Sequence, residues 1–331
     1  MMKRTIFLVV SVLLLMGCKK NNPAENATTL TVYSYNSMSW IKDAIKADFE
    51  SLYNCTLTID TQFTDTGDML SKVVLEKKDP KADIILGITP ALLIKAKQHD
   101  ILSQYKSPNL KNIKNQKLLF DSNHYTTPYD YGSLAIIYNP DKIGDLKNFS
   151  DLWKMDKQLV IQDPRTSSTG LDFLMWTIAL YGDNWKNEWK SLHKGILATT
   201  SGWSESFAKF ESGEAAMMVS YATDLAYSYH YYKTVKNKIF IPEEGGYIQI
   251  EGASIIKGAK NKKLAEKFID YVLTKNFQEK IPLNQWMFPV IDVEMPEAFN
   301  YAVEPEKTVS ISNEIINSID SILEQWESIN Y

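Results

Sequence analysis

The chain has 331 residues, enough for two domains, and its 44% hydrophobic and 23% charged residues are typical of a globular protein. A formal net charge of −4 argues against a nucleic-acid partner, because such proteins concentrate positive charge on one face. Tyr and Trp occur 18 and 8 times, and both residue types line binding surfaces as well as cores.

The N-terminus predicts an export signal. Lys3 and Arg4 precede a short apolar run that ends in the letters LMGC, and this order describes a secretory signal over 1–17. The apolar run is too short for a spanning helix. The LMGC ending resembles a bacterial lipobox. That resemblance implies cleavage before Cys18, lipidation of this residue, and anchoring on the periplasmic or extracytoplasmic face of the cell membrane. The polar segment 18–29 predicts a flexible tether.

Strand-like and helix-like segments alternate along the rest of the chain. Alternating or β-rich runs predict strands, and apolar residues at helical spacing predict helices. In chain order we expect strand 30–35, helix 40–52, strand 55–63, helix 65–78, strand 81–87, helix 91–100, an extended crossing segment 124–140, strand 159–164, helix 171–182, helix 205–214, strand 215–221, helix 225–235, an extended segment 247–256, and helices 262–274 and 312–329. This alternation predicts an α/β sheet covered by helices.

Signatures of enzymes and metal sites are missing from the sequence. It holds no G-x-S-x-G, H-E-x-x-H, Walker A or G-x-G-x-x-G pattern. The four His show no ligand spacing with one another or with cysteines, so we expect no metal site, no cofactor and no enzymatic activity. Cys55 is the one free thiol left once Cys18 is lipidated, and we expect a small buried hydrophobic residue there.

Four consecutive hydroxyl residues, 166–169, follow Asp163 and Arg165 and precede the helix expected over 171–182. A helix N-terminus binds anions through its free amides and its dipole, and Ser167 and Ser168 would add hydroxyl donors for a phosphate or carboxylate. A single capping hydroxyl in an ordinary loop explains the same pattern. Asp163 and Arg165 also suit a local ion pair. Both interpretations of the segment stay open.

Aromatic residues recur at the ends of the predicted elements. Ligands of open α/β sheets lie beyond the carboxyl ends of strands, where Tyr35, Asp65 and Tyr221 fall. Aromatic faces attract cations, and a carboxylate such as Asp65 or Asp224 strengthens that attraction. Core packing explains each aromatic residue taken alone, whereas their shared position at strand ends favours a site for a cation.

Six segments resemble the periplasmic thiamine-binding proteins of bacterial ABC importers. They are TVYSYNS, YDYGSLAIIYNP, QDPRTSSTGL, SGWSESF, GEAAMMVSYATDLAY and NQWMFPV, in this order between about Leu30 and Val290. The resemblance implies a two-lobed periplasmic solute-binding fold of the type II kind. One lobe would comprise 30–130 and 251–331, and the other 131–250. Thiamine, thiamine monophosphate or thiamine pyrophosphate would bind in the cleft between lobes joined by crossing strands. A monomer would then deliver the ligand to an ABC transporter permease.

The same resemblance implies a set of ligand-binding residues. The aromatic part of the cleft would comprise Tyr35, Trp40, Tyr221, Tyr227 and Trp286, with Ala222, Thr223 and Asp224 beside them; Asp65 and Thr66 would come from a loop, Ser167 and Ser168 would hold a phosphate, and Trp203 would close over the ligand. Asn36 departs from the family pattern, because relatives have an Asp there, and this removes a possible counter-charge for the cation. Closure is expected about a hinge near Tyr129–Ser133 and 252–256.

Other functions remain open at this stage. The same fold would also suit Fe(III), for which tyrosines are ligands, or a polyamine, for which Asp65, Asp130 and Asp224 would supply carboxylates. An exported enzyme acting on thiamine would have Cys55 as its one thiol nucleophile, but no His lies near it in the sequence. An adhesin is a further alternative for a surface lipoprotein.

Overall fold

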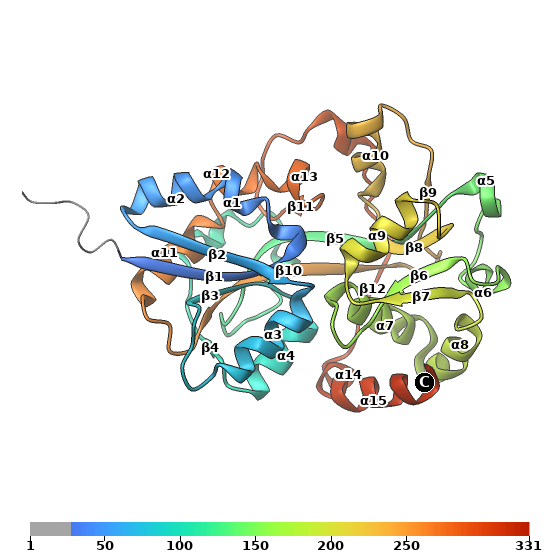
Figure 1. The fold of residues 1–331 in the computed structure, drawn as a ribbon, viewed down its shortest axis with the longest axis horizontal. Helices are drawn as coiled ribbons and strands as arrows, with labels where there is room; N and C mark the ends of the chain where they lie inside the picture. The colour runs from blue at the N-terminus through green and yellow to red at the C-terminus, as the bar shows by residue number, and fades with distance from the viewer. Residues whose placement is uncertain (1–27, 331) are drawn as a thin grey trace, which may run out of the picture.

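Two long strands join the two halves of the molecule. The structure is a computed structural model that describes residues 28–330, so the expected signal, Cys18 and most of the tether lie outside the described residues. β5 (Thr127–Tyr138) and β10 (Gly246–Ile256) pair antiparallel and run from one half into the other (Figure 1). Both strands are buried along most of their length, as central strands covered on both faces are.

The main path of the sheet has the strand order β2-β1-β3-β10-β5-β8-β6-β7. The remaining strands are β1 (Thr29–Tyr35), β2 (Thr56–Phe63), β3 (Ile84–Ile88), β4 (Leu102–Ser103), β6 (Leu159–Gln162), β7 (Ile196–Thr200), β8 (Met217–Tyr221), β9 (Lys238–Phe240), β11 (Phe288–Pro289) and β12 (Thr308–Val309). β1 pairs parallel with β2 and β3, and β6 pairs parallel with β7 and β8, whereas β10 and β5 are antiparallel to their neighbours on this main path. The sheet is therefore mixed.

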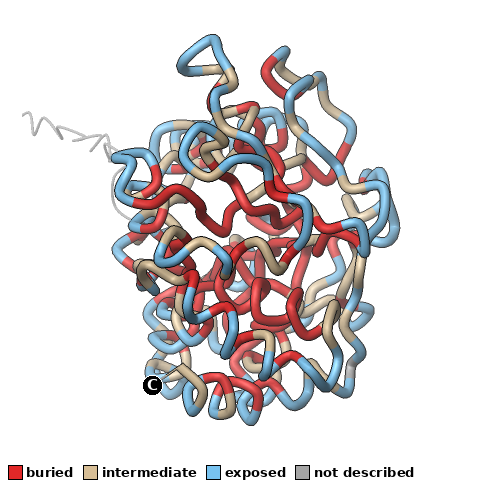
Figure 2. The backbone as a smooth tube through the Cα atoms, turned by 90° about the vertical axis from the view of Figure 1, so that its right-hand side faces the viewer, coloured by how far each residue is buried: buried red, intermediate tan, exposed pale blue. Residues whose placement is uncertain are grey.

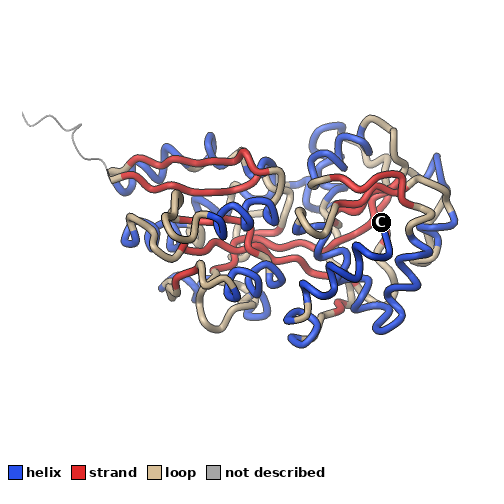
Figure 3. The backbone as a smooth tube through the Cα atoms, turned by 60° about the horizontal axis from the view of Figure 1, so that its bottom comes forward, coloured by secondary structure: helices blue, strands red, loops and turns tan. Residues whose placement is uncertain are grey.

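Helices cover the sheet in both halves (Figures 1 and 3). They are α1 (Ile41–Ala44), α2 (Lys46–Tyr53), α3 (Thr66–Leu75), α4 (Pro90–Gln98), α5 (Pro140–Ile143), α6 (Asp151–Lys154), α7 (Ser168–Tyr181), α8 (Trp185–Leu192), α9 (Trp203–Glu211), α10 (Asp224–Tyr232), α11 (Lys262–Tyr271), α12 (Lys275–Gln278), α13 (Ile281–Asn284), α14 (Asn313–Asn317) and α15 (Ile319–Asn330), with short 3-10 turns η1 (Asn36–Met38), η2 (Pro108–Asn112), η3 (Gln116–Leu118), η4 (Gly182–Asn184) and η5 (Glu297–Tyr301). We call the part with β1–β3, α1–α4 and α11–α13 the first half, and the part with β6–β8 and α6–α10 the second half. None of the helices within residues 28–330 has both the length and the apolarity that a bilayer crossing needs.

Most of the predicted elements are confirmed, including the crossing segment, which is β5. Asp65 caps α3 by accepting the amide of Thr66, as its position before the apolar pattern indicates. The sequence analysis missed β7 and α8, and it treated 312–329 as one helix where the structure breaks at Ser318. Cys55 is half-buried instead of buried, because it lies in the surface turn between α2 and β2.

Buried apolar residues of the strands and of the helices packed on them form the core of the molecule. Figure 2 shows these buried segments inside an outer layer of exposed turns. The last helix, α15, packs on α8, although the sequence analysis grouped 251–331 with the first lobe. The ring of Trp326 lies edge-on to Trp189, with 5.7 Å between centroids, and Arg165 lies over it at 5.6 Å. The boundaries of the two lobes remain a prediction.

We predict that Trp326→Ala lowers the free energy of unfolding by about 3–5 kcal/mol, because both tryptophan rings are 1% exposed and the substitution leaves a cavity. Urea unfolding followed by circular dichroism measures this. Leu75→Ala is the control, since that side chain is 84% exposed and its loss is expected to change little. An unfolding midpoint of Trp326→Ala at the same urea concentration as that of the wild type would show that this ring does not stabilise the packing of α15 on α8.

Candidate functional site

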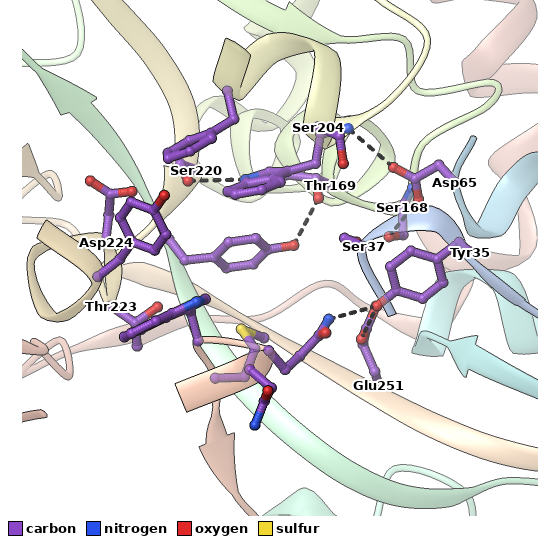
Figure 4. A pocket seen from close by; sticks show the side chains of 18 residues that line it. Tyr35, Ser37, Asp65, Ser168, Thr169, Ser204, Ser220, Thr223, Asp224 and Glu251 are labelled. Carbon is purple, nitrogen blue, oxygen red and sulfur yellow. Dashed lines mark hydrogen bonds between the residues drawn. The ribbon is translucent and has the colours of Figure 1, made fainter. Parts of the chain in front are cut away.

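A cavity of about 300 Å³ lies between the two halves, at the lower end of the range for small-molecule sites. Residues from both halves and from the crossing strand β10 line it (Figure 4). The lining residues are Tyr35, Ser37, Asp65, Ser168, Thr169, Trp203, Ser204, Phe207, Ser220, Tyr221, Thr223, Asp224, Tyr227, Glu251, Asn284, Gln285, Trp286 and Met287. The site is therefore assembled from segments far apart in the sequence.

Asp65 connects the two halves across this cavity. Its Oδ1 accepts the Thr66 amide of the first half at 2.7 Å and the Ser168 amide and hydroxyl of the second half at 3.2 and 3.3 Å. Its Oδ2 accepts the Trp203 amide, also of the second half, at 3.4 Å. Burial raises the pKa of Asp65, and hydrogen bonds from Ser167, Thr66 and Ser168 partly offset this. One carboxylate thus serves the N-termini of α3, α7 and α9.

The hydroxyl segment 166–169 is engaged by the protein itself. Ser167 caps α7 by accepting the Gly170 amide at 3.3 Å, and Ser168 donates to Asp65. Thr166 donates to the carbonyl of Ser201 at 2.9 Å, and Thr169 shares a 2.7 Å hydrogen bond with the hydroxyl of a tyrosine in β8. These contacts use the hydroxyls within the protein, and a role of Ser167 and Ser168 in holding a ligand phosphate stays a prediction. The anion at the mouth of α7 in this structure is the Asp65 carboxylate.

The local ion pair predicted beside this segment is confirmed. Arg165 Nε donates to Asp163 Oδ1 at 3.0 Å, and its guanidinium also contacts Glu327 of α15. This Arg therefore binds the C-terminal helix and does not line the cavity.

A series of aromatic rings forms one wall of the cavity. Trp203 stacks on Phe207 with centroids 4.7 Å apart, Phe207 meets Tyr227 edge-on at 5.2 Å, and Tyr227 meets Trp286 edge-on at 5.1 Å. The Trp203 indole also donates to the Ser220 hydroxyl at 3.1 Å, which fixes the orientation of the ring. These rings come from α9, α10 and the loop after α13, so the aromatic wall spans both halves.

Trp286 adopts an unusual backbone conformation. Its φ of 59° lies in the left-handed region, which a bulky side chain rarely adopts and which costs energy. The ring is held in place because it stacks on Phe299 at an interplanar angle of 7° and contacts Tyr227 of α10. Strain of this kind concentrates at binding sites, where the surroundings fix a side chain in its working position.

A carboxyl from β10 forms the deep end of the cavity. Glu251 Oε2 accepts the hydroxyls of Tyr35 at 2.5 Å and Tyr129 at 3.1 Å, and Gln285 Nε2 donates to the Tyr35 hydroxyl at 2.9 Å. Burial raises the pKa of Glu251 to about 7. The sequence analysis missed Glu251, although an acidic residue in the middle of the extended run YIQIEGASII is a signal for a buried functional carboxyl.

The charge of the cavity lining is one-sided. Asp65, Asp224 and Glu251 supply three carboxyls, and no Lys, Arg or His is among the lining residues. Burial, with Glu211 nearby, raises the pKa of Asp224 to about 7. A buried carboxylate needs a positive partner or hydrogen bonds, so this lining favours a cationic ligand and disfavours an anionic one.

The structure brings most of the predicted site residues together. Those that line the cavity are Tyr35, Asp65, Ser168, Trp203, Tyr221, Thr223, Asp224, Tyr227 and Trp286. Trp40 lies one layer behind the wall, where its indole donates to Gln285 at 2.9 Å. Thr66, Ser167 and Ala222 are buried next to lining residues without lining the cavity themselves.

Further contacts hold the two halves close. The Ser204 hydroxyl donates to Asn36 Oδ1 at 2.9 Å, so the residue that departs from the family pattern bridges the cleft. The Asp68 amide donates to the Thr166 carbonyl at 3.2 Å, and a Cβ on Gly67 would lie 2.6 Å from that oxygen. Glycine at this position therefore permits the close approach of α3 to the segment before α7.

Metal-binding groups are missing from the part of the chain that the structure describes. Within residues 28–330 no three His, Cys, Asp or Glu side chains lie together in a way that would hold a metal ion. The hydroxyls of Tyr35 and Tyr221 are both hydrogen-bonded, and burial raises the pKa of each well above its ordinary value, which disfavours a tyrosinate ligand.

Comparison with known proteins identifies the family. Residues 34–279 match the family model described as bacterial extracellular solute-binding protein. A thiamine-binding periplasmic protein from Salmonella typhimurium is 31% identical over 92% of this chain and 94% of its own length, and one from Brucella suis is 35% identical over 87% of each. A solved periplasmic thiamin binding protein superposes with a TM-score of 0.86 at 28% identity, covering 92% of this chain and 97% of that one. The chain belongs to the bacterial extracellular solute-binding proteins.

Proposed function

We propose that this chain binds thiamine in the cavity between its halves and delivers it to an ABC importer in the membrane. The observation that carries the proposal is the lining of the cavity, which combines aromatic rings with three carboxyls and lacks basic side chains. Thiamine joins a flat aminopyrimidine to a thiazolium ring with a fixed positive charge. Aromatic faces and carboxylates are the groups that such a cation prefers. The chain acts as a monomeric binding protein and not as an enzyme.

A polyamine is the second candidate, because several carboxyls suit a chain of ammonium groups. The aromatic wall favours thiamine, since a flat ring stacks on it and a flexible aliphatic chain gains less. Isothermal titration of the purified protein with thiamine and with putrescine distinguishes the two. Tight binding of putrescine alone would overturn the thiamine proposal.

We predict that Trp286→Ala weakens thiamine binding by about 10- to 100-fold, because the substitution removes both the stacking surface and the cation–π attraction of the indole. Isothermal titration calorimetry measures the change. Tyr301→Ala is the matched control, since Tyr301 is an exposed aromatic residue outside the cavity. Equal affinities of wild type and Trp286→Ala would place the ligand elsewhere.

Thiamine phosphates form a separate part of the proposal. A phosphate ester at the mouth of α7 must compete with Asp65, whose carboxylate accepts the Ser168 amide. We therefore propose that thiamine binds in preference to its phosphates, and that Asp65 sets this preference.

Asp65→Asn is expected to raise the affinity for thiamine monophosphate relative to thiamine by about 10-fold, because it removes one negative charge near the phosphate and keeps an acceptor oxygen. Titration of both ligands gives the ratio. Asp68→Asn, an exposed change one turn along α3, is the control and leaves the ratio unchanged. An unaltered ratio in Asp65→Asn would show that the phosphate lies away from this carboxylate.

We also propose that the protein is exported, lipidated on Cys18 and held at the extracytoplasmic face of the cell membrane. The basic flank, the short apolar run and the LMGC ending support this. Cys18→Ser is expected to move the protein from the detergent phase to the aqueous phase in Triton X-114 partition of cell extracts. Cys55→Ser is the control, because it removes the other thiol and leaves the anchor. Partition of Cys18→Ser into detergent would argue against the lipid.

A further inference from the structure

Two buried carboxyls face each other where the crossing strands meet. Glu251 of β10 pairs directly with Asp130 of β5. Opposite residues of an antiparallel pair point to the same face, with Cβ atoms about 4.5–5.5 Å apart. Glu251 is 3% exposed and Asp130 is fully buried. The two acids therefore share one desolvated space.

The hydrogen bonds at this pair are unevenly distributed. Glu251 Oε2 accepts two tyrosine hydroxyls, while no hydrogen bond reaches its Oε1 among the described residues. Neither carboxylate oxygen of Asp130 has a hydrogen-bond partner in the described part of the chain. Glu251 lines the cavity, so its unpartnered oxygen is available to a ligand.

The donors around Glu251 are arranged for a negative charge. Gln285 donates to the Tyr35 hydroxyl, which in turn donates to Glu251, so this chain of donors ends on the carboxyl. Tyr129 adds a second hydroxyl. An arrangement of donors alone stabilises the carboxylate over the neutral acid.

The surroundings of Glu251 oppose that charge until a cation arrives. The titratable groups around it are Tyr35 of β1, Tyr129 and Asp130 of β5, Asp65 before α3, Asp172 of α7 and Tyr221 of β8, and none of these is basic. Burial and the carboxyl of Asp65 raise the pKa of Glu251, whereas the hydrogen bonds from Tyr35 and Tyr129 lower it. Burial raises the pKa of Glu251 to about 7 and that of Asp130 well above its ordinary value. Two carboxyls this close ionise as a pair, and the second charge is costly.

We propose that Glu251 is the counter-charge of the cationic ligand, and that binding of the cation expels a proton from the Glu251–Asp130 pair into the solvent. This inference rests on the proposed function and adds a binding residue and a proton to it. The proton leaves the carboxyl of Glu251, the electron pair stays on the carboxylate, and the fixed charge of the ligand replaces the lost proton. Affinity therefore falls as the pH is lowered through 7 and levels off above 8.

Titration calorimetry of thiamine into the wild-type protein counts the released protons when each pH is measured in two buffers that both buffer at that pH and differ in their ionisation enthalpy. We expect about half a proton per ligand at pH 7, close to one at pH 6 and almost none at pH 8.5. Release that is zero at all three pH values, with thiamine still bound, would overturn the inference and leave the proposed function intact. If thiamine produces neither heat nor a thermal shift, the proposed function fails first.

Three variants locate the source of the proton. Glu251→Gln is expected to abolish the release and to weaken thiamine at least about 30-fold at pH 8, because it removes one partner of a buried charge pair. Asp224→Asn removes the other cavity carboxyl with a pKa of about 7 and is expected to keep the release. Glu243→Gln, on the exposed turn before β10, keeps both affinity and release. Loss of the release in Asp224→Asn instead of Glu251→Gln would refute the assignment. If Glu251→Gln does not fold, the proton release of the wild-type protein at the three pH values still tests the inference.

Discussion

The contact between the two halves depends on one carboxylate that both halves use. Asp65 caps α3 in its own half and accepts the amides that begin α7 and α9 in the other. Three helix N-termini thus share a single negative charge, and each would otherwise leave amides without partners in a buried place. When the halves separate, α7 and α9 lose this acceptor. Gly67 leaves room for α3 to approach the Thr166 carbonyl, because any Cβ at this position would lie 2.6 Å from that oxygen. The contact between the halves therefore needs both the small residue and the carboxylate of Asp65.

The distribution of charge in the cavity follows from the same constraint. With Asp65 at the mouth of α7, the positive ends of the helices are already neutralised and do not offset the other acids. Glu251 and Asp224 then remain in a lining without basic residues. A buried carboxylate without a positive counter-charge is costly unless a ligand supplies that charge. A cation in the cavity supplies it, and an aromatic wall that spans both halves gives the cation a flat surface.

The sequence predicts the local features of this protein better than the distant ones. Asp65 is recognisable as a helix cap because it stands directly before an apolar helical pattern. Its hydrogen bond to Ser168 joins residues 103 positions apart, and no local sequence pattern predicts such a contact. The four hydroxyls left a ligand anion and ordinary capping both open for the same reason, since the sequence does not show that the Asp65 carboxylate of the other half reaches Ser168. The aromatic residues converge as predicted because strand ends and helix starts meet at one edge of a sheet.

The sequence analysis missed Glu251 because this residue lies inside a strand, whereas ligand-binding residues were sought at the ends of strands. Its position gives it a property that residues at strand ends lack. β5 and β10 run through both halves, so the Glu251–Asp130 pair lies on the two strands that join the halves. Tyr35 reaches Glu251 from the first half, whereas Gln285, which donates to Tyr35, precedes the strained Trp286 of the aromatic wall. Two hydrogen bonds thus connect Glu251 to Gln285, the residue directly before Trp286 of the aromatic wall. A ligand without a positive charge can contact the aromatic wall, but it gives Glu251 no counter-charge. The carboxyl of Glu251 then keeps its proton, and the free-energy cost of burying this group is not offset.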